Sequence, residues 1–160
     1  MLRKRPLVLL DLEQTLTEDW ISRSAAPALL MDNIELVRAE LGTNAELEMG
    51  LMSWAIQDEG DMDAFQRLLR PALEEVLSHS FADRWCLSMD QWAHELLVSS
   101  GKLLSREDIF DIFGKPELLF KLATIHPELQ GRDVTLLDDS FQNMVLSLPE
   151  RGTTARVIRI

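Results

Sequence analysis

Short apolar runs alternate along the chain with longer segments in which apolar residues recur at helical spacing. The stretch Pro6–Leu16 opens with an apolar run that stops at Asp11. This run is too short for a typical helix and is typical of a parallel strand buried on both faces. Val134–Leu137 is a run of the same kind, and it ends at the pair Asp138 and Asp139. The pattern therefore predicts two central strands, each of which ends in a carboxylate.

The same pattern predicts the remaining elements. Further strands are expected at Glu48–Ile56, where periodicity also fits a buried helical turn, and at Arg84–Met89 and Ala155–Ile160. Helices are expected at Leu30–Leu41, Asp61–Leu77, Gln91–Val98, Arg106–Phe113, Pro116–Ile125 and Phe141–Leu148. Pro71 should interrupt the second of these, and Ser105 with Asp108 resembles a capping box at the start of the fourth. Alternation of this kind favours right-handed crossovers between parallel strands. We therefore predict an α/β fold, a Rossmann-like three-layer sandwich with a central, mostly parallel sheet and helices on both faces.

Length and composition set the scale of the molecule. A chain of 160 residues with 46% hydrophobic and 27% charged residues predicts one compact domain over residues 1–160. No apolar segment approaches the ~20 residues that cross a bilayer, and the first apolar stretch is too short for a signal peptide. The lone Cys86 lies in an apolar context and is expected to be a buried, inert thiol. We therefore expect a soluble, cytoplasmic protein.

The formal net charge of −11 narrows the range of partners. Tight binding to duplex nucleic acid or to an anionic membrane requires a basic surface, so neither partner is expected. A phosphorylated substrate is compatible with this charge, because a metal ion and one or two nearby cations dominate over distant, screened charges.

Two motifs carry a resemblance to a known family. The sequence DLEQTL, which begins at Asp11, and the sequence VTLLDDS, which ends at Ser140, resemble the first and fourth motifs of the haloacid dehalogenase-like (HAD) superfamily. Most members of that superfamily are magnesium-dependent phosphohydrolases. Their first motif is usually Asp-x-Asp-x-Thr-Leu, so the chain matches at Asp11, Thr15 and Leu16. It carries Glu13 in place of the second aspartate.

The resemblance implies roles for the acidic residues. Asp11 would attack phosphorus and form an aspartyl-phosphate, which divides hydrolysis into two displacements. Glu13 would protonate the leaving oxygen and later activate water, as a general acid and base. A Mg²⁺ ion would be bound by Asp11 together with Asp138 or Asp139, since Mg²⁺ prefers hard oxygen ligands. A further oxygen ligand would come from the backbone carbonyl of Glu13.

The resemblance also implies three residues that bind the phosphoryl group of the substrate. Thr15 belongs to the first motif, and Ser53 lies at the end of the second predicted strand, where the family keeps a Ser or Thr. Lys115 precedes the helix that leads into the second carboxylate-tipped strand, where the family keeps a lysine. Its ammonium would offset the charge of the phosphate and of the attacking carboxylate. Lys121, in the same helix, is the alternative.

Glu13 is the position at which the chain departs from the family pattern. Its side chain is one methylene longer than aspartate, and a displacement of ~1 Å in a catalytic group can lower a rate about a hundredfold. A working enzyme with a shifted acid, a slow enzyme, and a fold that binds without turnover all follow from this difference. Because the other expected residues are present, we favour a magnesium-dependent phosphatase that acts on a phosphomonoester. The alternative is a catalytically inactive HAD-like binding or regulatory module.

The short connections between elements predict an open site without a large cap insertion. The gaps after the first motif and after the third strand leave room for no more than a loop or one helix. An open site would admit a phosphate at the end of a larger molecule, or a neighbouring subunit of a homo-oligomer would supply the lid. We therefore expect a phosphorylated substrate, either a small molecule or the end of a larger one. Trp20, within Thr17–Pro27, and Trp54 follow predicted strand ends and are candidates to line the mouth. Trp85 and Trp92 lie on apolar faces and are expected in the core.

Overall fold

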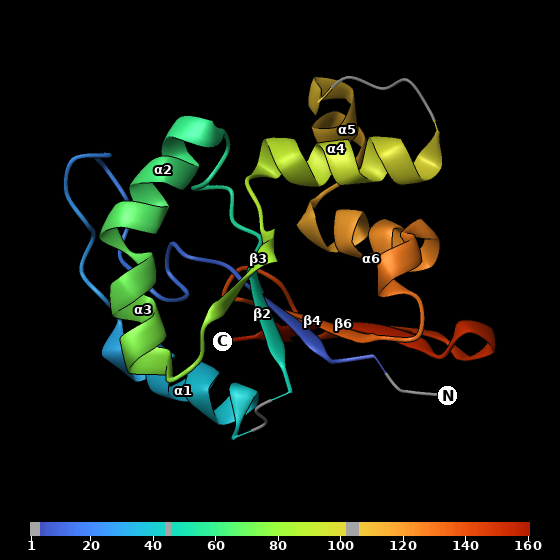
Figure 1. Cartoon of the computed structure of the whole chain (residues 1–160), viewed down its shortest axis with the longest axis horizontal. Coiled ribbons are helices and arrows are strands. Elements are labelled where there is room, and N and C mark those ends of the chain that lie inside the picture. The colour runs from blue at the N-terminus through green and yellow to red at the C-terminus, as the bar shows by residue number, and fades with distance from the viewer. Residues whose placement is uncertain (1–3, 44–45, 102–105) are drawn as a thin grey trace.

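Six strands form one mixed sheet in the computed structural model, in the spatial order β3-β2-β1-β4-β6-β5 (Figure 1). The structure describes residues 4–43, 46–101 and 106–160, so Ser105 of the predicted capping box lies outside the described residues. The strands are β1 (Leu7–Leu10), β2 (Glu48–Leu51), β3 (Phe81–Cys86), β4 (Asp133–Asp138), β5 (Met144–Leu148) and β6 (Thr153–Arg159). Neighbouring strands are parallel except for β5 and β6. The buried run that predicted the first strand is β1, and it lies inside the sheet between β2 and β4.

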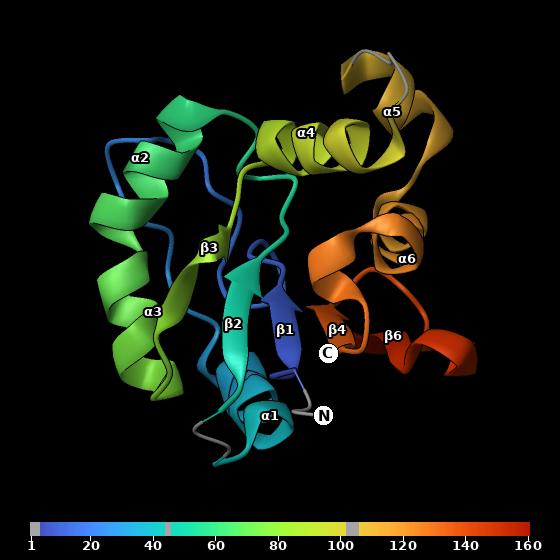
Figure 2. The ribbon, with the colours of Figure 1, turned by 45° about the vertical axis from the view of Figure 1, so that its right-hand side comes forward.

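Helices cover both faces of this sheet. Those in the described part of the chain are α1 (Met31–Leu41), α2 (Glu59–Leu68), α3 (Arg70–Leu77), α4 (Met89–Ser100), α5 (Arg106–Ile112) and α6 (Lys115–Ile125), with short 3-10 segments η1 (Pro127–Leu129) and η2 (Pro149–Arg151). Figures 1 and 2 show α1, α2 and α3 on one face and α4, α5 and α6 on the other. Successive side chains of β1 serve the two cores in turn: Leu7 and Leu9 pack beneath α4 to α6, and Val8 and Leu10 beneath α1 to α3. The predicted three-layer α/β architecture is confirmed.

Local sequence signals explain several helix boundaries. The helix α1 ends at Gly42, whose φ of 63° favours glycine. The predicted break near Pro71 separates α2 from α3, because proline fits the first turn of a helix and cannot donate an N–H to a preceding turn. The helix α4 begins earlier than predicted, at Met89, because Ser88 and Gln91 form a capping box. None of the described helices has the length and apolar character that crossing a membrane requires.

The predicted helix Phe141–Leu148 is wrong, because Met144–Leu148 forms the edge strand β5, antiparallel to β6. Its side chains alternate between half-buried and exposed positions, and Val145 is 69% exposed. This period of two is typical of a strand that is covered on one face only. The chain then turns through η2 and Gly152, whose φ is 65°, into β6.

Two other strands differ from the prediction in their bounds. The strand β2 ends at Leu51 rather than Ile56, because the chain turns after Ser53, whose carbonyl accepts the N–H of Ile56. The strand β3 begins at Phe81 and ends at Cys86, three residues earlier than predicted at each end. The connection from β3 to β4 contains the three predicted helices, α4, α5 and α6.

Gly50 allows β2 and β3 to approach each other closely. A Cβ atom at this position would lie 2.6 Å from the backbone oxygen of Trp85 and 2.8 Å from a methyl carbon of Leu9. Trp85 is fully buried, and its ring stacks on that of Trp92, so both tryptophans lie in the core as predicted. A larger residue at position 50 would have to displace strand backbone as well as side chains.

We predict that Gly50→Ala lowers the free energy of unfolding by about 1–3 kcal/mol, because the added methyl group overlaps the backbone of β3. Urea unfolding followed by circular dichroism measures the change. Val145→Ala, on the exposed side of the edge strand, is the control and should change the free energy of unfolding by less than ~0.5 kcal/mol. An unchanged unfolding midpoint for Gly50→Ala would contradict the close approach of the two strands.

Candidate active site

The candidate site begins where β1 and β4 end. These strands pair in parallel with Leu10 opposite Leu137, so the residues that follow them leave the sheet side by side. The N–H of Asp11 donates to the carbonyl oxygen of Leu137 at 3.1 Å. Asp138 is the last residue of β4, and Asp139 follows it. The parallel register therefore brings acids from opposite ends of the chain to one edge of the sheet.

Asp11, Asp138 and Asp139 form one group of carboxylates, called here the acidic cluster. Each contributes a carboxylate oxygen, and these three oxygens lie within 4.8 Å of one another. Asp11 and Asp138 are buried, and Asp139 is half-buried. The structure thus brings together the acids of the two motifs.

Lys115 lies between two carboxylates of the acidic cluster. Its ammonium nitrogen Nζ donates to Asp11 Oδ1 at 2.9 Å and to Asp138 Oδ2 at 2.6 Å. Lys115 is the first residue of α6, directly after the cap residue Gly114, and it is 2% exposed. Because a buried charge requires a partner, these contacts tie α6 to the ends of β1 and β4. The alternative, Lys121, is exposed.

Thr15 links Asp11 to Asp139. Its hydroxyl oxygen lies 2.9 Å from Asp11 Oδ2 and 3.0 Å from Asp139 Oδ1, and it accepts the N–H of Asp139 at 3.0 Å. The backbone returns Thr15 to the acidic cluster, because its N–H and those of the next two residues all donate to the carbonyl oxygen of Leu12. Its one hydroxyl proton can serve only one carboxylate at a time. Thr15 therefore bridges the acids, and its contact with a phosphate stays a prediction.

Ser53 lies beside the backbone that carries Asp11. Its hydroxyl oxygen accepts the N–H of Leu12 and the N–H of Ala55, each at 3.3 Å, and the residue is buried. These bonds satisfy two backbone donors just beyond the ends of β1 and β2. Ser53 thus contacts the residue that follows Asp11, and its predicted contact with a substrate is untested.

Glu13 faces the loop that follows it in the chain. Its Oε2 accepts the N–H of Trp20 at 2.8 Å. Glu13 is not a member of the acidic cluster, so the structure does not group its carboxylate with the other predicted metal ligands. Coordination of a metal ion by its backbone carbonyl stays a prediction. The Trp20 amide was not among the predicted site groups, because a backbone N–H carries no residue-specific signal.

The two tryptophans predicted at the mouth differ in their surroundings. Trp54 follows Ser53 and is 37% exposed, and its ring meets that of Phe110 in α5 edge to face, with centroids 4.8 Å apart. Trp20 is half-buried and packs against the core beneath α1 to α3. Trp54 therefore offers an accessible aromatic surface one residue from the site.

Cys86 is a buried free cysteine at the end of β3. Burial raises the pKa of its thiol to about 11, so the thiol is protonated at neutral pH. Cys86 is therefore buried, as the sequence predicted, and little of the thiolate, which is the nucleophilic form, is present at neutral pH.

Burial and neighbouring charges shift the protonation of Asp11. Burial raises the pKa of its carboxyl above the ordinary value, the charge of Lys115 lowers this pKa, and the charge of Asp138 raises it. The net shift is upward, because one ammonium does not compensate for burial and a second carboxylate. A cation bound at the acidic cluster would favour the charged form that a nucleophile needs.

The acidic cluster suits a hard divalent cation. Its donors are carboxylate oxygens, which Mg²⁺ prefers over nitrogen and sulfur ligands. With Lys115, the three carboxylates carry a formal charge of −2, which one divalent ion would balance. The residues present therefore fit the predicted Mg²⁺ ion.

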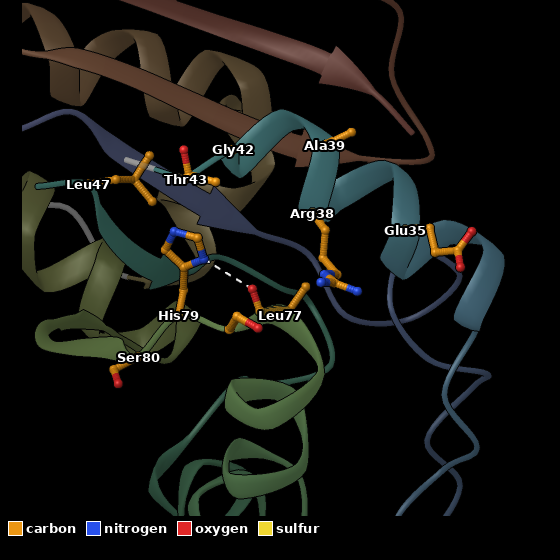
Figure 3. Close-up of a pocket in the computed structure, with 10 residues that line it drawn as sticks. Glu35, Arg38, Ala39, Gly42, Thr43, Leu47, Leu77, His79 and Ser80 are labelled. Carbon is orange, nitrogen blue, oxygen red and sulfur yellow. Dashed lines mark hydrogen bonds between the residues drawn. The ribbon is translucent and has the colours of Figure 1, made fainter. Parts of the chain in front are cut away.

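A cavity of about 940 Å³ lies near the amino ends of β2 and β3, away from the strand ends that carry the acidic cluster (Figure 3). It is lined by the ends of α1 and α3 and by residues that precede β2 and β3, among them Arg38, Leu47 and His79. Nδ1 of His79 lies 3.0 Å from the carbonyl oxygen of Leu77, as the dashed line in Figure 3 shows. This cavity shares no lining residue with the acidic cluster and is not part of the candidate site.

Comparison with known proteins identifies no relative of the chain. No protein-family model, no curated protein and no solved structure matches it. A function for the chain is therefore inferred from the geometry of the site and from the resemblance of its two motifs.

We predict that Asp11→Asn stabilises the protein at neutral pH when no divalent cation is present. The pKa of Asp11 is higher in the folded state than in the unfolded state, so the charged carboxylate lowers the free energy of unfolding. This destabilisation grows as the pH rises from the unfolded-state pKa through the folded-state pKa. The gain from the substitution should be present at pH 7, should shrink as the pH falls and should disappear near the ordinary value of 3.8. Chemical unfolding in EDTA across this range measures it. A gain that grows toward low pH would contradict the raised pKa.

Proposed function

We propose that the protein is a Mg²⁺-dependent phosphohydrolase of the HAD type, which cleaves a phosphomonoester through Asp11. One observation supports the proposal above all. The carboxylates of both motifs lie together, in contact with the ammonium of Lys115, at the carboxyl ends of β1 and β4. Such an enzyme needs a carboxylate nucleophile, oxygen ligands for a cation, and a fixed positive charge near the phosphate. Groups of all three kinds are present in this one place.

In the first step, a carboxylate oxygen of Asp11 attacks the phosphorus atom of the ester. The new O–P bond forms while the bond from phosphorus to the leaving oxygen breaks, and that oxygen takes a proton and departs as an alcohol. The hydrogen bonds from Lys115 to Oδ1 and from Thr15 to Oδ2 orient the attacking carboxylate. The ammonium of Lys115 also stabilises negative charge on the phosphoryl oxygens.

In the second step, water attacks the aspartyl-phosphate. The O–P bond to Asp11 breaks, inorganic phosphate leaves, and the carboxylate is regenerated. Glu13 is the proposed proton donor in the first step and the proton acceptor in the second. Its Oε2 is bonded to the Trp20 amide, whereas Oε1 has no hydrogen-bond partner within the described residues and can carry the proton.

The acidic cluster would hold the Mg²⁺ ion, together with the backbone carbonyl of Glu13. When bound, the ion would supply positive charge that reduces the repulsion between a carboxylate nucleophile and an anionic ester. Asp138 is oriented for this role by two bonds, since Oδ2 accepts from Lys115 and Oδ1 accepts the N–H of Ser140 at 2.9 Å.

The proposed substrate is a phosphomonoester, either a small molecule or the phosphorylated end of a larger one. The accessible ring of Trp54, next to Ser53, supports a mouth with an aromatic wall on the β2 side. A second copy of the chain is an alternative source of a lid. The free thiol of Cys86 suits a reducing, cytoplasmic location.

A second candidate function is a HAD-like binding or regulatory module without turnover. Glu13 favours this alternative, because its carboxylate is not grouped with the acidic cluster. In that case, the acidic cluster would bind a divalent cation or a phosphorylated ligand, but proton transfer to the leaving oxygen would fail.

We predict that the protein releases phosphate from para-nitrophenyl phosphate only when Mg²⁺ is present, and that Asp11→Asn lowers the rate at least about a thousandfold. Mass spectrometry of an acid-quenched reaction should find a phosphoryl group on the peptide that contains Asp11. Arg38→Gln, on the exposed surface of α1, is the control and should retain the wild-type rate. If no phosphomonoester of a broad set is hydrolysed while Mg²⁺ still binds, the inactive module is the correct function.

We predict that Glu13→Asp lowers turnover by about tenfold to a hundredfold, because the shorter side chain gives up its bond to the Trp20 amide. Glu13→Ala should lower turnover further, since it removes the proton carrier. Turnover rates at saturating Mg²⁺ measure both effects. A large gain in Glu13→Asp would show instead that the extra methylene limits the reaction.

A further inference from the structure

The segment 13–30 forms a loop between β1 and α1, called here the 13–30 loop. At its base, Thr17 pairs with Leu29 in an antiparallel bridge. At its tip, the indole N–H of Trp20 donates to two backbone oxygens of the following residues, which makes the segment 20–25 a compact turn. The two ends of the loop are therefore defined by separate sets of hydrogen bonds.

Arg23 fastens the tip of the 13–30 loop to the start of α2. Its Nε donates to Asp61 Oδ1 at 2.7 Å, and its Nη2 donates to Asp58 Oδ1 at 2.9 Å. The guanidinium lies against Gly60, where a Cβ atom would come within 2.4 Å of Nη1. Two carboxylates and a residue without a side chain thus form a site shaped for one guanidinium group.

These ion pairs add to the apolar contact that Trp20 makes with the core beneath α1 to α3, because the next residue of the tip makes almost none. Ile21 is 96% exposed. A cavity of about 180 Å³ is lined by the tip on one side and by Ala55 and Asp61 on the other, so the tip does not pack densely against the rest of the protein there. An exposed ion pair stabilises little by itself, but two carboxylates that share one guanidinium restrict its position together.

The tip also holds the carboxylate of Glu13. The N–H that donates to Glu13 Oε2 at 2.8 Å belongs to Trp20, in the same compact turn as Arg23. A continuous series of contacts therefore leads from the start of α2, through Arg23 and the Trp20 amide, to the proposed general acid.

We propose that Arg23 is a positioning residue for Glu13. Bound to Asp58 and Asp61, it fixes the tip of the 13–30 loop, and the Trp20 amide then keeps the Glu13 carboxylate where it can protonate the leaving oxygen. This inference rests on the proposed function, because it concerns proton transfer by Glu13. Loss of the Arg23 guanidinium loosens the tip and weakens the bond to Glu13, while the nucleophile and the acidic cluster keep their own contacts.

The first test compares two esters that differ in their need for a general acid. An alkyl phosphate such as glycerol phosphate has a poor leaving group and depends on protonation, whereas para-nitrophenyl phosphate depends on it little. We expect Arg23→Gln to lower kcat/KM about tenfold to a hundredfold for the alkyl ester and less than about threefold for the aryl ester. In the Glu13→Gln background, Arg23→Gln should cause no further loss, because the two residues act through one proton transfer. Arg38→Gln is the matched control and should change neither ester.

The second test does not depend on activity. Hydrogen exchange of the Trp20 amide should become at least about tenfold faster in Arg23→Gln and stay unchanged in Arg38→Gln. Asp61→Asn should accelerate the same amide, since it removes one partner of the guanidinium.

Three outcomes separate the claims. If the wild-type protein hydrolyses neither ester, the proposed function fails and the role of Glu13 fails with it, while hydrogen exchange still decides whether Arg23 holds the loop. If both esters are hydrolysed and Arg23→Gln lowers both equally, Arg23 has only a structural role. If exchange at Trp20 is unchanged in Arg23→Gln, Arg23 does not position the tip and the inference is wrong.

Discussion

The structure of the candidate site depends on one buried ammonium group shared by two buried carboxylates. Asp11 and Asp138 leave adjacent parallel strands at the same edge, so their charges would repel strongly in an interior of low dielectric constant. Lys115 contacts both and is itself almost completely buried, so its charge is paired by the two carboxylates and offsets part of their repulsion. This contact also joins α6 to the central strands, and it limits the upward shift of the Asp11 pKa that burial causes.

The other residues of the site form two sets, and different parts of the structure hold each set in place. Asp138 and Asp139 are held by the end of β4, by Thr15 and by the backbone of the following residue, so their positions come from the sheet. Glu13 depends instead on a backbone N–H in the 13–30 loop. A site of this construction can keep its cation ligands and its nucleophile in place while the proton carrier responds to changes in the loop.

Sequence reasoning succeeds where a residue's surroundings follow from its own neighbours in the chain. The strand before Asp11 could be predicted, because a four-residue run buried on both faces has an unmistakable apolar pattern. The edge strand β5 could not, because its half-exposed residues alternate over only five positions and also fit one face of a short helix. Pro71 and Gly42 marked helix boundaries correctly, since their effects are local.

Contacts between distant residues were harder to predict. The resemblance to a family implied that Lys115 lies near the attacking carboxylate of Asp11, but it gave no indication that Asp138 is a second partner. Arg23 belongs to no recognisable motif, so its role could not be predicted. Its partners lie on another element, and its connection to Glu13 passes through a backbone amide. Such links become visible only when the chain is folded.

The proposed function requires that the acidic cluster binds a divalent cation beside the nucleophile. The most direct measurement is anomalous diffraction from crystals soaked in Mn²⁺, which has the same preference for oxygen ligands as Mg²⁺. We expect one anomalous peak about 2.1 Å from carboxylate oxygens of Asp11 and of Asp138 or Asp139. A crystal that shows no peak at these carboxylates at saturating Mn²⁺, with the contacts of Lys115 unchanged, would contradict it.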